Sequence, residues 1–205
     1  MNETWIKPTS LPDNNKNTRI FIVSAPSGAG KTTLINALLC KFKTMLFSVS
    51  CTTRKPRTGE RNGVDYNFIH QDEFKQKILA GKWAEWAKVY DNYYGTDAEF
   101  LDMNLALGKH VVLDIDVQGT IQMLNRYTDI VTIFIMPPAL ETLRERLNAR
   151  GTDTPKVIEK RLQDAKNEIA KKDLYHHVII NDHLPSAVSE LIAIVEQYIK
   201  DMNRK

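Results

Sequence analysis

The residues with the clearest potential for chemistry form a loop of small side chains that ends in Gly-Lys-Thr. An apolar, β-branched stretch (residues 19–23) precedes this loop, and a stretch of helical character (residues 34–40) follows it. This is the context of a phosphate-binding loop, whose backbone N–H groups and helix N-terminus attract a polyphosphate. Lys31 would reach the β- and γ-phosphates, and the Thr32 hydroxyl would ligate Mg²⁺. The predicted triphosphate-binding residues are Ala25, Pro26, Ser27, Gly28, Ala29, Gly30, Lys31, Thr32 and Thr33.

An alternative reading of this loop is a glycine-rich turn that carries an ordinary solvated lysine. Ala25 also departs from the general pattern, which has glycine at that position, and its methyl group requires a negative φ. The strand before the loop and the helix after it favour the phosphate-binding interpretation.

A second candidate site is the basic stretch at residues 51–61. It holds four basic residues within eight positions, together with hydroxyls, a proline and a glycine. This composition indicates a surface loop. Arg54 and Arg57 could bind a terminal phosphate through bidentate contacts, whereas the alternative is a basic loop that only faces water.

Glu85 is the third candidate, because it lies between two tryptophans in a predicted strand over residues 83–90. Strict alternation would put Glu85 on the same face as Trp83 and opposite Trp86. A carboxylate in such apolar company is either an exposed glutamate on an edge strand or a group with a specific partner.

Two acidic residues, Asp114 and Asp116, end an apolar strand predicted over residues 110–116. A phosphate-loop enzyme needs a carboxylate near its Mg²⁺, and ligands of open α/β sheets collect at the carboxyl ends of strands. The alternative role for these carboxylates is to cap a turn or a helix.

Three arginines form a further basic group. Arg146 and Arg150 share one face of a helix predicted over residues 140–150, and Arg161 lies in the next helix, from Thr154 to about residue 172. A glycine break joins the two helices, so they could form a mobile flap whose arginines bind an anion. A plain helical hairpin with a solvated basic face is the alternative.

These candidates are carried by alternating strands and helices. Further strands are predicted at residues 47–50, 64–69, 129–135 and 178–182, and helices at 72–80, from a Thr96 capping box to about 107, and at 186–202. Pro138 is expected to be the first residue of the helix after the 129–135 strand, and Leu79 to face inward. The class is therefore α/β, and residues 50–96 form an inserted lobe rich in short strands.

The composition narrows the possible classes further. A chain of 205 residues suits one well-cored domain, and a net charge of +3 is too small for an obligate nucleic-acid binder. Two cysteines without a partner set, and no apolar run of membrane length, favour a cytoplasmic protein that is neither membrane-bound nor zinc-dependent. Residues 1–18 are expected to be a flexible extension without a signal peptide.

Several motifs, taken together, resemble the guanylate kinase family, which phosphorylates GMP from ATP. They are Ser-Ala-Pro-Ser-Gly-Ala-Gly-Lys-Thr (24–32), the arginine loop (50–60), Asn-Tyr-Tyr-Gly-Thr (92–96) and Leu-Asp-Ile-Asp-Val-Gln-Gly (113–119). The resemblance covers about residues 18–200. A phosphate loop alone indicates only nucleoside triphosphate binding, whereas the arginine loop with the Tyr-Tyr-Gly turn is far more specific.

The resemblance implies a P-loop core with a five-stranded parallel sheet flanked by helices, an inserted mixed-β GMP-binding lobe and a helical lid. The implied boundaries are a core of residues 19–49, 97–137 and 171–200, a lobe of 50–96 and a lid of 138–170, all within a domain of 19–200. The implied partners are ATP, GMP and Mg²⁺, with no nucleic acid or membrane. The protein is expected to be a monomer or a simple homo-oligomer.

The resemblance also assigns roles to individual residues. Arg54, Arg57, Tyr66 and Tyr94 would hold the GMP phosphate, and Glu60 would orient the arginines. Glu85 would accept from guanine N1–H and the 2-amino group, while Ser50 and Thr96 would donate to the O6 side. Asp114 and Asp116 would order Mg²⁺-bound water and the acceptor phosphate. Arg146, Arg150 and Arg161 would close over the ATP phosphates with Lys31, and Asn181 would lie near the adenine.

Two rival functions stay open from the sequence. Guanylate-kinase-like domains of scaffolding proteins bind peptides without catalysis, but Lys31, Thr32, Arg54, Arg57 and Asp114 are all present here. Another nucleoside monophosphate kinase is the second rival, and the arginine loop and Glu85 argue against it.

Overall fold

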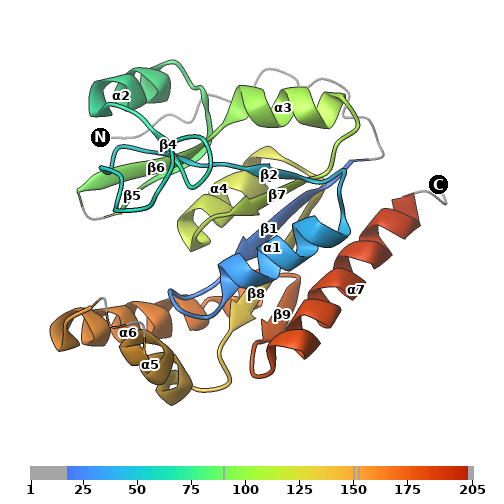
Figure 1. The fold of residues 1–205 in the computed structure, drawn as a ribbon. Helices are drawn as coiled ribbons and strands as arrows, with labels where there is room; N and C mark the ends of the chain where they lie inside the picture. Colours follow the sequence, from blue (N-terminus) through green and yellow to red (C-terminus); the bar gives the residue numbers. More distant parts are fainter. Residues whose placement is uncertain (1–17, 90, 150, 152, 203–205) are drawn as a thin grey trace.

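The computed structural model describes residues 18–89, 91–149, 151 and 153–202. A five-stranded sheet, parallel throughout, lies at its centre (Figure 1). In spatial order its strands are β2 (Leu46–Ser48), β7 (Val111–Asp114), β1 (Ile20–Ser24), β8 (Ile130–Met136) and β9 (His177–Ile180). The predicted five-stranded parallel sheet is confirmed. Because Val23 pairs with Asp114, the carboxyl ends of β1 and β7 meet at one edge of the sheet.

Helices cover both faces of the parallel sheet, and alternation along β1 shows why. Phe21 and Val23 pack in the cluster formed with helices α1 (Lys31–Lys41) and α7 (Leu184–Met202). Ile20 and Ile22 pack on the other face, in the cluster formed with α3 (Ala98–Ala106) and α4 (Val117–Arg126). A strand that is apolar on both faces is typical of the centre of such a sheet.

A second, mixed sheet lies on one side of the carboxyl end of the parallel sheet. In spatial order its strands are β4 (Asn67–Phe68), β3 (Cys51–Thr52), β6 (Asn92–Asp97) and β5 (Trp83–Val89). Helix α2 (Gln71–Leu79) packs on it through Phe74, whose ring stacks on Trp83 with centroids 4.2 Å apart. This agrees with an inserted mixed-β unit, although β4 is shorter than the predicted strand over residues 64–69.

A β-bulge in β5 corrects the predicted orientation of Trp83. The pairing with β6 shifts between Trp83 and Glu85, so strict alternation does not hold there. Trp83 packs in the same apolar cluster as Trp86, while Glu85 faces away from that cluster. The prediction that Trp83 and Glu85 share a face is therefore wrong.

Two further local predictions are wrong at the ends of helices. Thr96 belongs to β6, and the N-cap of α3 is Asp97, whose carboxylate accepts a hydrogen bond from the Phe100 N–H. Leu79, predicted to face inward, is 86% exposed at the end of α2, and Phe74 carries the packing of that helix.

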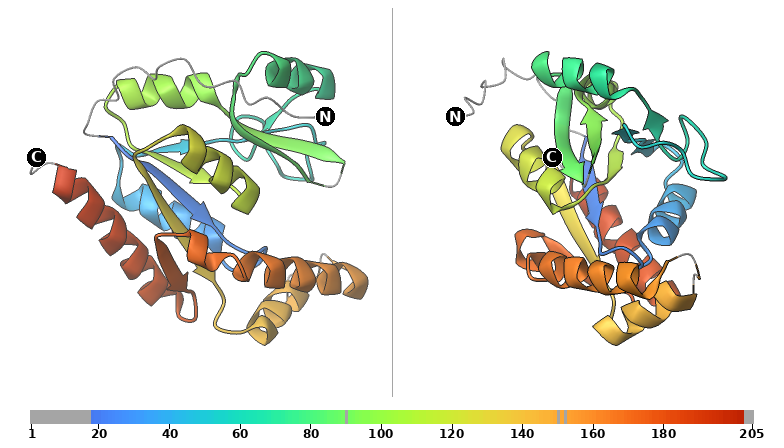
Figure 2. Two further views of the ribbon diagram at one scale, coloured as in Figure 1. Left: turned by 180° about the vertical axis from the view of Figure 1, so that it is seen from behind. Right: turned by 90° about the vertical axis from the view of Figure 1, so that its left-hand side faces the viewer.

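A pair of helices lies on the opposite side of the parallel sheet from the mixed sheet (Figure 2). Helix α5 (Leu140–Ala149) begins two residues after Pro138, which is not its first residue as predicted. Helix α6 (Pro155–Ile169) does begin at a proline, and a 3₁₀ turn at Lys172–Leu174 follows it. The two helices pack through their own small core of Leu140, Leu143, Leu147, Ile158, Leu162 and Ala165. We call this pair the helical lid.

Within the part of the chain that the structure describes, no helix combines the length and apolarity that a membrane span requires.

Candidate active site

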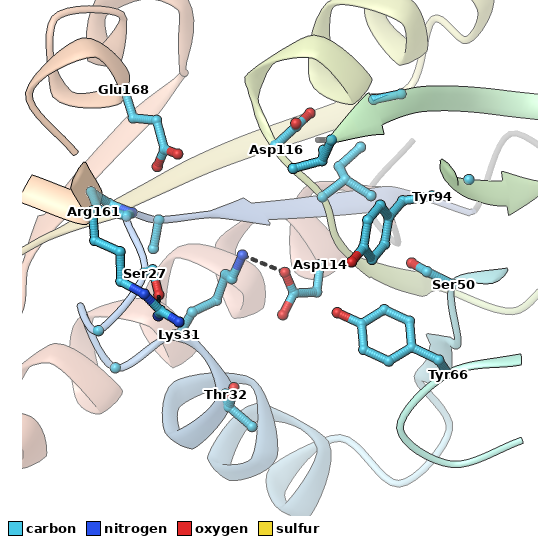
Figure 3. A pocket seen from close by; sticks show the side chains of 18 of the residues that line it. Ser27, Lys31, Thr32, Ser50, Tyr66, Tyr94, Asp114, Asp116, Arg161 and Glu168 are labelled. Carbon is cyan, nitrogen blue, oxygen red and sulfur yellow. Dashed lines mark hydrogen bonds and ion pairs between the residues drawn. The ribbon is translucent and has the colours of Figure 1, made fainter. Parts of the chain in front are cut away.

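A cavity of about 550 Å³ lies where the parallel sheet, the mixed sheet and the helical lid meet (Figure 3). Its walls include the loop after β1, the carboxyl end of β7, one face of the mixed sheet and helix α6. Predicted site residues that line it are Ala25, Pro26, Ser27, Gly28, Gly30, Lys31, Thr32, Thr33, Ser50, Arg57, Tyr66, Glu85, Tyr94, Asp114, Asp116 and Arg161. Tertiary structure thus brings together residues from both predicted nucleotide sites.

The loop between β1 and α1 has the backbone of a phosphate cradle. Gly28 and Gly30 have φ of 98° and 97°, a left-handed conformation that side chains rarely adopt, and Ala29 N–H donates to the Pro26 carbonyl over 3.0 Å. The loop leads directly into the N-terminus of α1, whose unpaired N–H groups and partial positive charge favour an anion.

Asn181, predicted to lie near the adenine, supports the backbone of this loop. Its side-chain amide donates to the Ala29 carbonyl over 2.7 Å, and its side chain is buried. Asn181 is absent from the cavity lining given above, and its backbone carbonyl accepts a hydrogen bond from Arg146 over 2.9 Å. Its role in the structure is therefore to hold the loop.

Lys31 and Asp114 form an ion pair at the base of the cavity. The pair is a direct consequence of topology, since β1 and β7 are neighbours and Asp114 is the last residue of β7. Burial lowers the pKa of Lys31, but the charge and hydrogen bond of Asp114 outweigh this effect, so the pKa is raised overall. Lys31 is thus held as a cation, as binding of phosphate oxygens requires.

The arginine loop is organised by Glu60. Arg54 donates to both carboxylate oxygens of Glu60, over 2.9 and 2.8 Å, and the Arg57 N–H donates to Glu60 over 2.7 Å. The Arg54 guanidinium also lies over the Tyr66 ring, 5.4 Å from its centroid. This geometry suits the predicted orienting role of Glu60. Arg57 lines the cavity, whereas Arg54 and Glu60 do not.

Glu85 is almost completely buried, at 5% exposure, although β5 is an edge strand of its sheet. The exposed-edge interpretation is therefore wrong. Burial raises the pKa of Glu85 to about 7, and the charge of Asp116 adds to this shift, while hydrogen bonding by Thr96 opposes it. The Thr96 hydroxyl, expected to donate to guanine O6, instead donates to Glu85 Oε1 over 2.6 Å. Thr96 is fully buried and is not part of the cavity lining.

Asp116 caps a helix and also lines the cavity. Its carboxylate accepts a hydrogen bond from the Gly119 N–H over 2.9 Å and so caps helix α4. The same residue lines the cavity, and Figure 3 shows it on the wall opposite the phosphate-binding loop. A capping role and a place in the site are thus compatible.

The lid contributes Arg161 to the cavity. Its guanidinium donates to the Ser27 hydroxyl over 2.6 Å and pairs with Asp153 at 3.3 Å, so it links α6 to the phosphate-binding loop (Figure 3). Arg146 lies outside the cavity lining, and Arg150 lies outside the described residues.

Sequence reasoning missed Glu168, which lines the cavity from helix α6 (Figure 3). Burial raises its pKa to about 7, and the charge of Lys31 opposes this shift. Glu168 lies seven positions after Arg161, which is two helical turns, so the two residues share a face of α6. That spacing is the signal by which it could have been found.

The fold and the cavity define a P-loop protein of the nucleoside triphosphate-binding type, in which a buried carboxylate, Glu85, lines the same cavity as the loop. A family model described as guanylate kinase matches residues 17–198. The chain belongs to the guanylate kinase family, a group of nucleoside monophosphate kinases.

Individual relatives agree with this assignment. A guanylate kinase of Symbiobacterium thermophilum is 45% identical over 86% of this chain and 83% of its own length. One of Protochlamydia amoebophila is 46% identical over 90% and 93%. Among solved structures, a guanylate kinase from Anaplasma phagocytophilum superimposes with a TM-score of 0.73 at 32% identity, covering 88% of this chain and 85% of that one.

Proposed function

We propose that this protein transfers the γ-phosphoryl group of ATP to GMP, and to dGMP, giving ADP and the corresponding diphosphate. It would serve purine nucleotide metabolism by recycling GMP. The observation that carries the proposal is that Lys31 of the phosphate-binding loop and the buried Glu85 line one cavity. Lys31, which would bind the triphosphate, and Glu85, which would read the base, then lie in one cavity.

On the acceptor side, Glu85 is the base reader. Guanine offers two adjacent donors, N1–H and the 2-amino group, and one carboxylate can accept from both. Adenine has a bare N1 and no 2-amino group, so it would leave a buried carboxylate unpaired. A site built to bond a polar group can discriminate by about 10⁴-fold. Thr96 serves this function indirectly, because its hydroxyl holds Glu85 in place.

The acceptor phosphate is bound by the arginine loop and its neighbours. Arg57, Tyr66 and Tyr94 line the cavity, and Tyr66 and Tyr94 lie edge to face with centroids 5.9 Å apart. Arg54 lies outside the cavity lining, where Glu60 holds its guanidinium, and it would join these residues when GMP binds. Bidentate arginine contacts position a phosphate with defined orientation, as transfer in line with the donor requires.

On the donor side, the loop amides and Lys31 bind the β- and γ-phosphates, and Arg161 approaches them from the lid. These groups spread the negative charge that develops on the transferred phosphoryl group. Closure of the lid would exclude water, which would otherwise hydrolyse ATP. Arg161 already donates a hydrogen bond to Ser27 of the loop, so its guanidinium lies next to the proposed site of the ATP phosphates.

The residues present also fit Mg²⁺. The Thr32 hydroxyl and the Asp114 carboxylate line the same cavity as Lys31. Mg²⁺ in such sites takes one or two protein oxygens and completes its shell with phosphates and water, so no larger ligand cluster is needed. No group of three His, Cys, Asp or Glu able to hold a metal occurs among residues 18–202 where the structure describes them. Bound there, Mg²⁺ would neutralise phosphate charge.

We place the protein in the cytoplasm, as a monomer or simple homo-oligomer, without nucleic-acid or membrane partners. Both cysteines are free thiols, Cys40 exposed and Cys51 buried, which suits a reducing compartment.

The deciding experiment is a coupled assay of ADP formation with GMP, dGMP, AMP, UMP and dTMP as acceptors. We expect kcat/KM for GMP to exceed that for AMP by about 10⁴-fold. The variant Lys31→Ala serves as the control for contaminating kinases, because it should lose activity with every acceptor. Equal activity with AMP and GMP would reject the base-reader assignment, and no ADP formation with any acceptor would favour a binding module.

A further inference from the structure

We propose that Gly119 is a positioning residue for base recognition, because its missing side chain fixes where the Glu85 carboxylate lies. The inference rests on the proposed function, in which Glu85 reads guanine. Gly119 lies in the first turn of α4, three residues after the N-cap Asp116. Helix α4 packs on the parallel sheet, whereas Glu85 belongs to β5 of the mixed sheet.

The two residues are in direct contact. A methyl group built on Gly119 would lie 2.5 Å from Glu85 Oε2 and 3.1 Å from Glu85 Cδ, closer than side-chain atoms normally approach. The backbone does not demand glycine here, because Gly119 lies within a helix and has no positive φ. Alanine has a higher helix propensity than glycine by about 1 kcal/mol. The contact therefore supplies a reason for glycine at position 119: any side chain there would occupy the space of the Glu85 carboxylate.

Hydrogen bonds to α4 hold the strand that carries Glu85 in place. Gln122 on the same face of α4 bonds to both backbone groups of Trp86, accepting from its N–H over 3.2 Å and donating to its carbonyl over 2.7 Å. Arg126, one turn further on, donates to the Trp83 carbonyl over 2.8 Å. The edge of β5 is thus tied to α4 on both sides of Glu85.

Thr96 holds the other carboxylate oxygen from the neighbouring strand, through the 2.6 Å bond to Oε1. A methyl group at position 119 would therefore displace the carboxylate toward the cavity rather than displace the strand. The displacement needed to restore normal contact is close to an ångström. A misplacement of that size can cost about 100-fold in catalysis.

The test is Gly119→Ala, assayed for KM and kcat with GMP and ATP varied in turn. We expect KM for GMP to rise by about 10- to 100-fold, while KM for ATP stays within about twofold. The matched control is Gln118→Ala, which changes an exposed residue in the same helical turn and should leave both KM values within about twofold.

A second variant separates this role from a general packing defect. Glu85→Asp shortens the side chain by one methylene and withdraws the carboxylate from position 119. Glu85→Asp alone should weaken GMP binding, but adding Gly119→Ala to it should raise KM for GMP by no more than about twofold. Unequal penalties in the two backgrounds would show that the residues act through their contact.

Three results would overturn the inference: an unchanged KM for GMP in Gly119→Ala, equal loss of GMP and ATP binding, or the same penalty in both backgrounds. If Gly119→Ala is too unstable to assay, the cycle is read from Tm, and failure of Glu85→Asp to restore stability has the same meaning. Failure of the proposed function is separate, because the unmodified protein would then not prefer GMP.

Discussion

Lys31 and Asp114 meet as an ion pair between the first turn of α1 and the end of β7. The two residues are far apart in sequence, and the parallel pairing of β1 with β7 brings them together. The pair places Lys31, the cation proposed to bind the triphosphate, next to Asp114, the carboxylate expected to order Mg²⁺-bound water. The ion pair thereby connects the phosphate-binding loop to the carboxyl end of β7.

Replacing Asp114 by asparagine should therefore impair turnover more than binding. Lys31 would lose the charge that orients it, and we expect kcat to fall by about 10²–10³-fold. Asp129→Asn is a suitable control, since Asp129 forms an exposed ion pair with Arg19, and pairs of that kind contribute little. A kcat for Asp114→Asn within about threefold of the unmodified protein would contradict this assignment.

Glu85→Gln should weaken GMP binding and stabilise the empty protein. The amide presents a donor where the carboxylate accepts, so KM for GMP should rise by at least about 100-fold with little change for ATP. An unchanged KM for GMP would remove Glu85 from its role.

The stability effect of Glu85→Gln follows from linkage. The pKa of Glu85 is about 7 in the folded chain against a reference of 4.5, so between these values the folded state retains a proton that the unfolded state has released. The free energy of unfolding consequently falls as pH rises through that window, by roughly 3 kcal/mol in total. Without nucleotide, the glutamine variant should be more stable above about pH 7 and similar below about pH 4.5, as measured by denaturant titration.

Glu168→Gln should alter the pH dependence of ATP binding. The pKa of Glu168 is about 7, set by burial, by the opposing charges of Lys31 and Lys171, and by Asp116 and Asp164, which raise it. As pH rises through about 7, the carboxylate becomes charged and repels phosphates, so ATP binding weakens.

We expect Glu168→Gln to bind ATP about 3- to 10-fold more tightly than the unmodified protein at about pH 8, with little difference at about pH 6. Glu159→Gln is the matched control on the same helix, because Glu159 pairs with Arg144 away from the cavity. Identical pH profiles for Glu168→Gln and the unmodified protein would show that this carboxylate does not face the bound phosphates.

Arg161→Ala should lower kcat by about 10³-fold, because an arginine that stabilises a transferring phosphoryl group contributes on that scale. Arg161→Lys should recover only part of the loss, since an ammonium lacks the planar fork. Ser27→Ala removes the hydroxyl that Arg161 bonds in this structure, and it should change kcat by less than about tenfold. Equal damage from Ser27→Ala and Arg161→Ala would mean that the arginine acts through the loop.

Much of the site was predictable because its motifs are contiguous. The loop from Ser24 to Thr33 carries its own conformational requirements, namely two glycines with positive φ between a strand and a helix. Strand ends are similarly local, so Asp114 could be assigned to the edge where ligands collect. The α/β class follows from alternating strands and helices, and the resemblance to the family implied the five-stranded parallel sheet.

Packing between distant segments decided the rest. Alternation placed Trp83 on the face of Glu85, but a bulge moved it, and helix α4 buried a carboxylate on an edge strand. The sequence placed Glu168 on the same face of its helix as Arg161, but only the packing of α6 against the phosphate-binding loop brought that face into the cavity. The sequence by itself determined the loop proposed to bind the triphosphate, because its residues are neighbours along the chain. Only the tertiary structure decided where the Glu85 carboxylate, proposed to read the base, lies and what surrounds it, because its contacts come from segments that meet only after folding.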